Sequence, residues 1–229
     1  MRYDFREKAV EGGLAALALL SLAVLAGIVF YLFREGLPVF ASTGFLDFVF
    51  GTDWYPVGDQ PDFEIGSLIA GSLAVTFLAS LFAVPLGLMT AAYLSEVAAN
   101  TTRRIIKPFI ELLAALPSVV IGFIGMVLVA PWLQNTLGIA TGLNLFNAAL
   151  MLAFMAVPTI CSIAEDALHA VPRSLKDASL ALGATPWETL KNVTFPYALS
   201  GVGTAVMLGM SRALGETMVV LMVAGGAAI

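Results

Sequence analysis

Apolar residues gather in five long stretches along the chain, and polar segments separate them. A bilayer core about 30 Å thick is crossed by roughly 20 apolar residues in a helix, so each stretch is long enough to span it. The first stretch exceeds the roughly 7–15 apolar residues of a secretory signal, and four more follow, so we interpret it as a retained helix. The predicted spans are 12–33, 67–94, 109–133, 145–164 and 198–224.

Composition supports a membrane protein. Of the 229 residues, 59% are hydrophobic and 12% are charged, whereas a soluble domain has roughly 45–50% apolar and about 25% charged residues. We therefore predict an all-α fold, a polytopic transmembrane helix bundle. Pro85, Pro117 and Pro158 lie within or near the ends of the middle spans. Each frees a backbone carbonyl that neighbouring helices must shelter, which favours a packed bundle over a lone anchor.

The distribution of lysine and arginine predicts the orientation in the membrane. Basic residues precede the first span and lie between spans two and three and between spans four and five. The loop after span one has only Arg34 among several acids, and the short polar stretch at 134–141 after span three is uncharged. The N-terminus and the even-numbered loops are therefore predicted to be cytoplasmic. The basic residues are Arg2, Arg6, Lys8, Arg103, Arg104, Lys107, Arg173, Lys176 and Lys191.

The cytoplasmic segment 165–196 has the capping pattern of two short helices. Ser174 with Asp177 resembles a capping box that opens the first helix, and Gly183 suits the left-handed position after its end. The second helix is predicted from an N-cap, a proline at N1 and an acid at N3, which are Thr185, Pro186 and Glu188. Its apolar residues offer a surface that a partner protein or lipid headgroups can cover; they are Leu180, Leu182, Trp187 and Leu190.

A pair of opposite charges lies inside the fifth predicted span. Arg212 follows Ala198 by 14 residues, or about 21 Å along a helix, which is well inside the hydrocarbon region. An arginine at such depth normally faces the bundle interior or a water-filled path. Glu216 is spaced i, i+4 from it, so the two are predicted to neutralise each other. The pair is either a buried ion pair that fixes helix packing or a polar gate on a substrate path. Arginine suits the second role, because its planar guanidinium donates parallel hydrogen bonds to the oxygens of an anion such as phosphate.

Small residues share one face of this span with the charges, and large apolar residues share the other. Small residues let helices approach closely, so we expect the small face to point inward. The predicted inward face is Gly201, Ala205, Gly209, Arg212, Gly215 and Glu216, and the predicted lipid face is Met207, Met210, Leu214, Met218 and Leu221.

The spacing within 165–196 resembles a signature of ABC importer permeases, which is EAA, three residues, Gly, nine residues and I-x-L-P. Here Asp177-Ala178-Ser179 is followed after three residues by Gly183, and Val193-Thr194-Phe195-Pro196 begins nine residues later. In that family the loop docks into a groove on the ATPase subunit. The resemblance implies this coupling role for Asp177, Ala178, Ser179, Gly183 and Pro196.

Nearly the whole chain resembles the phosphate permease subunits of ABC importers, of PstC type. The motifs that carry the resemblance are Arg34-Glu35-Gly36-Leu37-Pro38, Gly51-Thr52-Asp53-Trp54-Tyr55-Pro56, Val84-Pro85-Leu86-Gly87, Tyr93-Leu94-Ser95-Glu96, Glu111-Leu112-Leu113-Ala114-Ala115-Leu116-Pro117-Ser118-Val119-Val120 and Ser211-Arg212-Ala213-Leu214-Gly215-Glu216-Thr217. The last three also resemble the paralogous PstA type.

This resemblance implies a single permease domain over 1–229, in the bacterial inner membrane. Its core is 67–229, preceded by an extra span and periplasmic loop at 1–66, with the coupling loop at 165–196. The family has six spans and the sequence stops after the fifth, so we expect a fragment. The implied partners are a second permease subunit of PstA type, two ATP-binding subunits of PstB type and a periplasmic phosphate-binding protein of PstS type. Cargo moves by alternating access, and a separate subunit binds and hydrolyses ATP.

Other functions are disfavoured. No G-x-x-x-x-G-K-[ST] loop occurs, so the chain is not expected to be an ATPase itself. We expect no cofactor in this chain, and no basic run indicates nucleic acid. The single histidine, His169, and the single cysteine, Cys161, stand in no cluster that predicts catalysis or a metal site. A permease for sulfate, molybdate or phosphonate remains an alternative, as do an ion-driven secondary transporter or channel and a structural membrane scaffold.

Overall fold

Four helical segments in the described part of the chain are long and apolar enough to cross a membrane. They are Val10–Gly36, Gly66–Val97, Ser118–Leu137 and Leu145–His169, and a fifth is the pair Pro186–Tyr197 and Leu199–Leu214, bent by 74°. The computed structural model describes residues 2–56 and 62–225. The predicted all-α polytopic fold is confirmed. Residue 1, residues 57–61 of the predicted periplasmic loop and residues 226–229 of the predicted permease domain lie outside the described residues.

The chain forms two compact units, Met1–Ile69 and Ala70–Ile229. In the first, a long helix α1 is followed by two short helices and a two-stranded antiparallel ribbon, in which Trp54 pairs with Phe63. The Asp53 N–H donates to Glu64 Oε2 at 2.8 Å beside this ribbon. The elements are α1 (Arg2–Gly36), α2 (Val39–Ser42), α3 (Phe45–Phe50), β1 (Trp54–Tyr55) and β2 (Asp62–Phe63).

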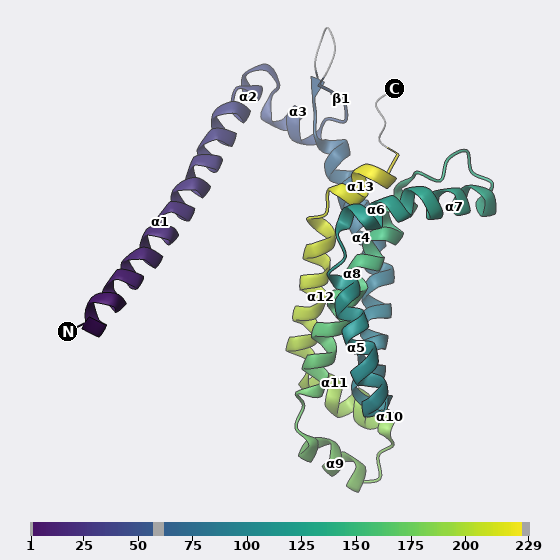
Figure 1. Ribbon diagram of the computed structural model, residues 1–229. Coiled ribbons are helices and arrows are strands. Elements are labelled where there is room, and N and C mark those ends of the chain that lie inside the picture. The colour runs from purple at the N-terminus through teal and green to yellow at the C-terminus, as the bar shows by residue number, and fades with distance from the viewer. Residues whose placement is uncertain (1, 57–61, 226–229) are drawn as a thin grey trace. The chain divides into compact units, whose positions relative to one another are not determined.

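The second unit is a bundle centred on helix α8 (Leu145–His169), with α4, α5 and α12 lying along it (Figure 1). Its core is made of small and medium apolar side chains, and Ile160 is fully buried at its centre. Gly87 of α4 and Gly209 of α12 both face Ile160, and a Cβ on either would lie within 3 Å of its side chain. Close helix approach therefore depends on these glycines. The main helices are α4 (Gly66–Ala92), α5 (Asn100–Ala114), α6 (Ser118–Ile124), α7 (Ala130–Leu137), α12 (Leu199–Leu214) and α13 (Met218–Val223).

Two predicted spans are broken in the structure. The third was predicted as one helix over 109–133, but α5 ends at Ala114 and α6 begins at Ser118. Pro117 between them has no N–H, and it disfavours the helical conformation of the residue before it. The fifth was predicted over 198–224, but α12 ends at Leu214 and α13 begins at Met218. The prediction of continuous helices there was wrong.

The short helices that connect α8 to α12 along the chain extend beyond one end of the bundle (Figure 1). They include π-helical turns, as do the ends of α4 and α6. We call the segment Arg173–Tyr197 the knob. Its elements are α9 (Arg173–Ala181), α10 (Pro186–Thr189), η3 (Leu190–Thr194) and α11 (Phe195–Tyr197), and the other π-helical turns are η1 (Tyr93–Val97) and η2 (Gly125–Val129).

Candidate functional site

Arg212 lies in the last turn of α12 and contacts two other helices. Its Nη2 donates to the Ala114 carbonyl at 2.7 Å, and its Nη1 donates to Thr159 Oγ1 at 3.3 Å. Ala114 is the last residue of α5, where the helix stops and the carbonyl loses its usual partner four residues on. The guanidinium therefore satisfies a backbone carbonyl that the break at Pro117 sets free. The side chain is half-buried and does not face outward on the apolar side of α12.

The predicted ion pair between Arg212 and Glu216 is not formed in the described part of the chain. Glu216 Oε1 instead accepts from the N–H groups of Met218 at 3.0 Å and Val219 at 3.3 Å. The i, i+4 prediction failed because α12 ends before Glu216. The carboxylate caps the free N–H groups that open α13, where negative charge is favoured.

The two faces predicted for the fifth span are largely confirmed on α12. Ala205 and Gly209 are buried, and a Cβ on Gly201 would meet Ala167 at 2.5 Å. Gly215 differs, because it is exposed at the break after α12. The predicted lipid face is exposed throughout; its members are Met207, Met210, Leu214, Met218 and Leu221.

Local hydrogen bonds shape the knob. Gly183 has φ +87°, and the N–H groups of Gly183 and Ala184 donate to the carbonyls of Leu180 and Ser179, which closes α9 with a Schellman turn. The predicted first capping box is wrong, because α9 begins after Pro172, without a side-chain cap from Ser174.

The N-cap, the proline and the acid predicted for the second short helix are confirmed, and in the structure Thr185 and Glu188 form a capping box. Thr185 Oγ1 accepts from the N–H of Glu188 at 3.3 Å, and Glu188 Oε2 accepts from the N–H of Thr185 at 2.8 Å. These backbone and side-chain hydrogen bonds from Thr185 hold the pKa of the Glu188 carboxyl below its ordinary value. The start of α10 is therefore fixed by two reciprocal contacts.

The residues predicted to couple the chain to an ATPase lie in two places on the knob. Asp177 and Ala178 are exposed on α9, and Ser179 Oγ lies 2.9 Å from Thr189 Oγ1, joining α9 to the end of α10. Gly183 is exposed at the turn between these helices, and Pro196 is exposed in α11. Leu182 and Trp187 beside them are 90% and 69% exposed. The knob thus presents an apolar surface without a cover in the described chain.

An ionic cluster at the knob end of the bundle was not predicted as a site. Glu165 of α8 is 1% exposed; its Oε1 lies 2.5 Å from Arg103 Nη2 and its Oε2 accepts from Lys107 Nζ at 2.7 Å. Arg103 and Glu165 form an ion pair, and Glu165 Oε1 accepts no hydrogen bond from the described residues. Lys107 also binds Asp166, and Arg103 contacts the ring of His169. Burial opposes the charged form of Lys107, but the hydrogen bonds to Asp166 and Glu165 outweigh it and raise its pKa.

A second ion pair attaches the knob to the bundle. Lys176 of α9 donates to Glu96 Oε1 at 2.5 Å, and Glu96 belongs to the π-helical turn that ends α4. Ser95 Oγ donates to the same carboxylate at 3.1 Å. From the sequence alone, Arg103, Lys107 and Lys176 predicted only the orientation of the chain in the membrane. Their acidic partners lie 58 to 80 residues away, which no local pattern reveals.

The fold is that of an ABC importer permease. Inward-facing structures of the MetNI methionine ABC transporter resemble the chain with a TM-score of 0.57 and 25% identity, over 66% of this chain and 72% of that chain. A second crystal form gives a TM-score of 0.56 and 26% identity. The broken spans and the knob thus occur in a multi-pass membrane subunit of an ATP-driven importer.

Sequence relatives define the family. The chain is 40% identical over 212 residues to the Probable ABC transporter permease protein YqgH of Bacillus subtilis, covering 92% of this chain and 69% of that protein. It is 35% identical over 231 residues to the Phosphate transport system permease protein PstC of Mesorhizobium japonicum (93% and 70% covered) and 36% over 228 residues to that of Pasteurella multocida (91% and 69%). The chain belongs to the binding-protein-dependent transport system inner membrane component family, whose model matches residues 83–229.

Proposed function

We propose that the chain is the permease subunit through which an ATP-driven importer carries inorganic phosphate across the inner membrane by alternating access. Two of the relatives described above are named as phosphate transport system permeases. The Bacillus subtilis relative carries a general permease name, so its name does not bear on the cargo. The choice of phosphate therefore rests on the relatives' names together with the chemistry around Arg212.

The observation that carries the proposal is the set of partners of Arg212. Both of its contacts, the Ala114 carbonyl and the Thr159 hydroxyl, are neutral. The described residues place no carboxylate in contact with the guanidinium, since Glu216 is turned toward α13. Its positive charge is therefore not neutralised, and it favours an anion nearby. A guanidinium can bind two oxygens of a phosphate at once, and an anion that did so would compete with the Ala114 carbonyl.

In this proposal a partner subunit binds and hydrolyses ATP, and the chain itself binds no cofactor. Asp177, Ala178, Ser179, Gly183 and Pro196 form the docking surface for the ATPase. The exposed apolar side chains of the knob support it, because large exposed apolar side chains on a soluble face are typical of interaction sites. The full importer would pair this chain with a second permease subunit, two ATP-binding subunits and a periplasmic phosphate-binding protein. The positive-inside pattern supports a cytoplasmic N-terminus and a cytoplasmic knob.

Replacement of Arg212 tests the cargo path. We expect Arg212→Gln to abolish uptake of radiolabelled phosphate by proteoliposomes that contain the whole importer, while assembly with the ATPase is kept. Arg212→Lys retains the charge but cannot donate bidentate hydrogen bonds, so this variant should transport phosphate more slowly than the wild type. Normal phosphate uptake by Arg212→Gln would refute the role. Competition by excess sulfate or molybdate equal to that by phosphate would refute phosphate as the preferred cargo.

A second variant tests docking of the knob. Leu182→Ser changes a 90% exposed side chain, so the fold should be preserved while co-purification with the ATPase decreases. Leu137→Ser is the matched control, because that leucine is also exposed, at 59%, but lies in α7, away from the knob. Equal recovery of the ATPase with both variants would contradict docking through Leu182.

A further inference from the structure

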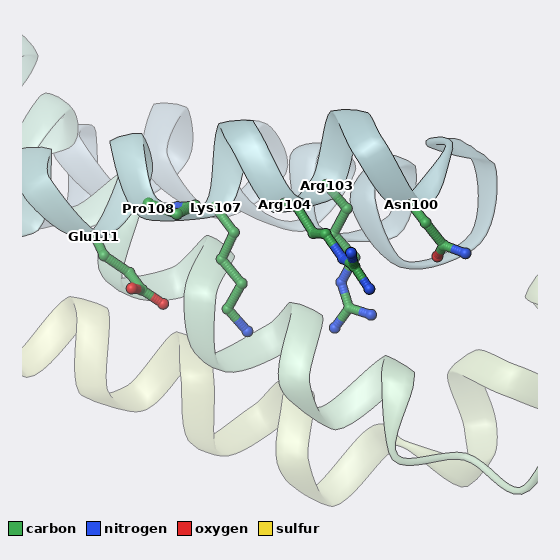
Figure 2. Close-up of a pocket in the computed structure, with 6 residues that line it drawn as sticks. All are labelled: Asn100, Arg103, Arg104, Lys107, Pro108 and Glu111. Atoms are coloured by element: carbon green, nitrogen blue, oxygen red, sulfur yellow. The ribbon is translucent and has the colours of Figure 1, made fainter.

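A cavity of about 390 Å³ lies beside helix α5 at the knob end of the bundle. Its lining consists of Asn100, Arg103, Arg104, Lys107, Pro108 and Glu111, and Figure 2 shows their polar side chains leaving one side of α5. Its volume is within the roughly 300–1,000 Å³ that is typical of sites for small ligands. Three of the six lining residues are cations, so the cavity is suited to an anion.

The three cations at this cavity differ in whether they are already paired with carboxylates. Glu165 and Asp166 lie on α8 and bind Lys107, and Glu165 also pairs with Arg103. Arg104 is exposed and makes no ion pair or hydrogen bond among the described residues. Glu111 and His169 complete the titratable groups at this place. An anion would therefore meet Arg104 first, with Arg103 and Lys107 held behind it.

The cavity and Arg212 lie on the same stripe of α5. Asn100, Lys107 and Ala114 recur every seven residues, which is about two turns, so they share one side of the helix. Arg212 binds the carbonyl of Ala114 at one end of the stripe, and Lys107 lies about 10 Å further toward the knob. The stripe thus leads from the candidate cargo site to the end of the bundle.

The opposite side of α5 is apolar and exposed. Ile105, Phe109 and Leu112 are between 55% and 64% exposed, and they lie roughly half a turn from the stripe. A basic residue that served only to hold lipid headgroups would be expected beside the surface that meets lipid. The position of the stripe away from this surface favours a small anion in the cavity over a headgroup.

We propose that Arg103, Arg104 and Lys107 form an exit site for the transported tetrahedral oxyanion on the cytoplasmic side of Arg212. This inference rests on the proposed function, because it takes the cargo and the orientation from it. The neighbouring carboxylates compete with the anion for the cations, so binding is weak. Weak binding suits a site that must release its cargo.

A cysteine reporter tests the site in the assembled importer. Asn100→Cys places a thiol at the cavity and leaves its three cations unchanged, and the chain's own Cys161 is buried. The complex, with partner cysteines replaced, is reconstituted in nanodiscs of phosphatidylcholine and treated with a negatively charged methanethiosulfonate. Inorganic phosphate should slow the reaction by a factor of 1 plus the ratio of its concentration to its dissociation constant, roughly threefold at twice that constant. Potassium chloride of equal ionic strength corrects for screening.

Second substitutions in the reporter chain identify the ligand. Adding Arg104→Gln should remove the protection by phosphate, whereas adding Arg34→Gln, an equal loss of charge elsewhere, should preserve it. The exit site is refuted if phosphate fails to protect in phosphatidylcholine, or if Arg104→Gln leaves protection unchanged. Protection that appears only on adding phosphatidylglycerol would also refute it, in favour of a lipid headgroup. None of these outcomes affects the uptake test on Arg212, so the exit site can fail while the transport proposal stands.

Discussion

The buried carboxylate Glu165 provides the sharpest test of how the cytoplasmic end of the bundle is held together. It is 1% exposed and lies between Arg103 and Lys107, whose side chains are 21% and 23% exposed. Removing one partner of a buried ion pair costs roughly 3–5 kcal/mol, because the other charge is left without compensation. Here the two cations can reach water in part, so we expect Glu165→Gln to lower the free energy of unfolding by about 3 kcal/mol, at the lower end of that range.

The neighbouring residue Asp166 is a matched control. It binds the same lysine, but its side chain is 63% exposed. Exposed ion pairs contribute about 0–1 kcal/mol, so Asp166→Asn should lower the free energy of unfolding by less than about 1 kcal/mol. Reversible unfolding of the purified chain in mixed dodecyl maltoside and SDS micelles measures both variants. Equal, small effects of the two substitutions would refute the assignment of the stability to burial.

The effect of Glu165→Gln on the free energy of unfolding should depend on pH in a direction that follows from Lys107. The pKa of Lys107 is raised above its ordinary value of 10.5 in the folded chain. Its contribution to stability is therefore complete below 10.5 and is lost as the pH rises through the higher folded value. The difference in free energy of unfolding between wild type and Glu165→Gln should stay constant from neutral pH to about 10 and decrease only above 10.5.

Three further predictions follow from other contacts. The ion pair between Glu96 and Lys176 ties α9 to the end of α4, so Glu96→Lys or Lys176→Glu alone should lower the amount of cargo taken up per ATP hydrolysed by the whole importer. The double exchange should restore this ratio, and no recovery in the double variant would count against the pair. The pKa of Glu188 is lowered, so its capping contribution is present above the unfolded value of 4.5 and lost as the pH falls through the folded value; Glu188→Gln should therefore differ from wild type in thermal unfolding at neutral pH but not in strong acid. Gly209→Ala should lower the free energy of unfolding by about 1–3 kcal/mol, because its methyl group overpacks on Ile160. Unfolding in mixed micelles should show that adding Gly209→Ala to Ile160→Ala lowers this free energy little below that of Ile160→Ala alone.

Features that depend on neighbouring residues were predictable from the sequence. The N-cap Thr185 and the left-handed Gly183 were predicted correctly because caps are set by residue types a few positions apart. The same approach failed at Ser174, where Pro172 begins α9 without a side-chain cap. The predicted spans that hold, such as 145–164 within the helix Leu145–His169, are those with an uninterrupted apolar run.

The breaks were hidden because hydropathy averages over about a full span, and the three non-helical residues in each break hardly change that average. Pro117 marks the first break, yet Pro85 and Pro158 are equally visible and lie inside continuous helices. The partners of Arg212 were not predictable either, since Ala114 and Thr159 are 98 and 53 residues away. Only the packing of α5 and α12 against α8 brings them together.

The two breaks and Arg212 together define a boundary within the bundle. Beyond the breaks, α6 and the π-helical turn η2 pack on α13, with Gly122 of α6 facing Met222 and Gly125 of η2 facing Val223. Before the breaks, α5 and α12 both pack on α8. Alternating access requires one group of helices to move against another, and residues at element ends absorb such changes most readily. The breaks supply element ends in both spans, and Arg212 lies where they meet, bound to the last carbonyl of α5. An anion that takes the guanidinium from Ala114 would release the contact that joins α12 to the end of α5, so cargo binding and helix movement would be linked by the same side chain.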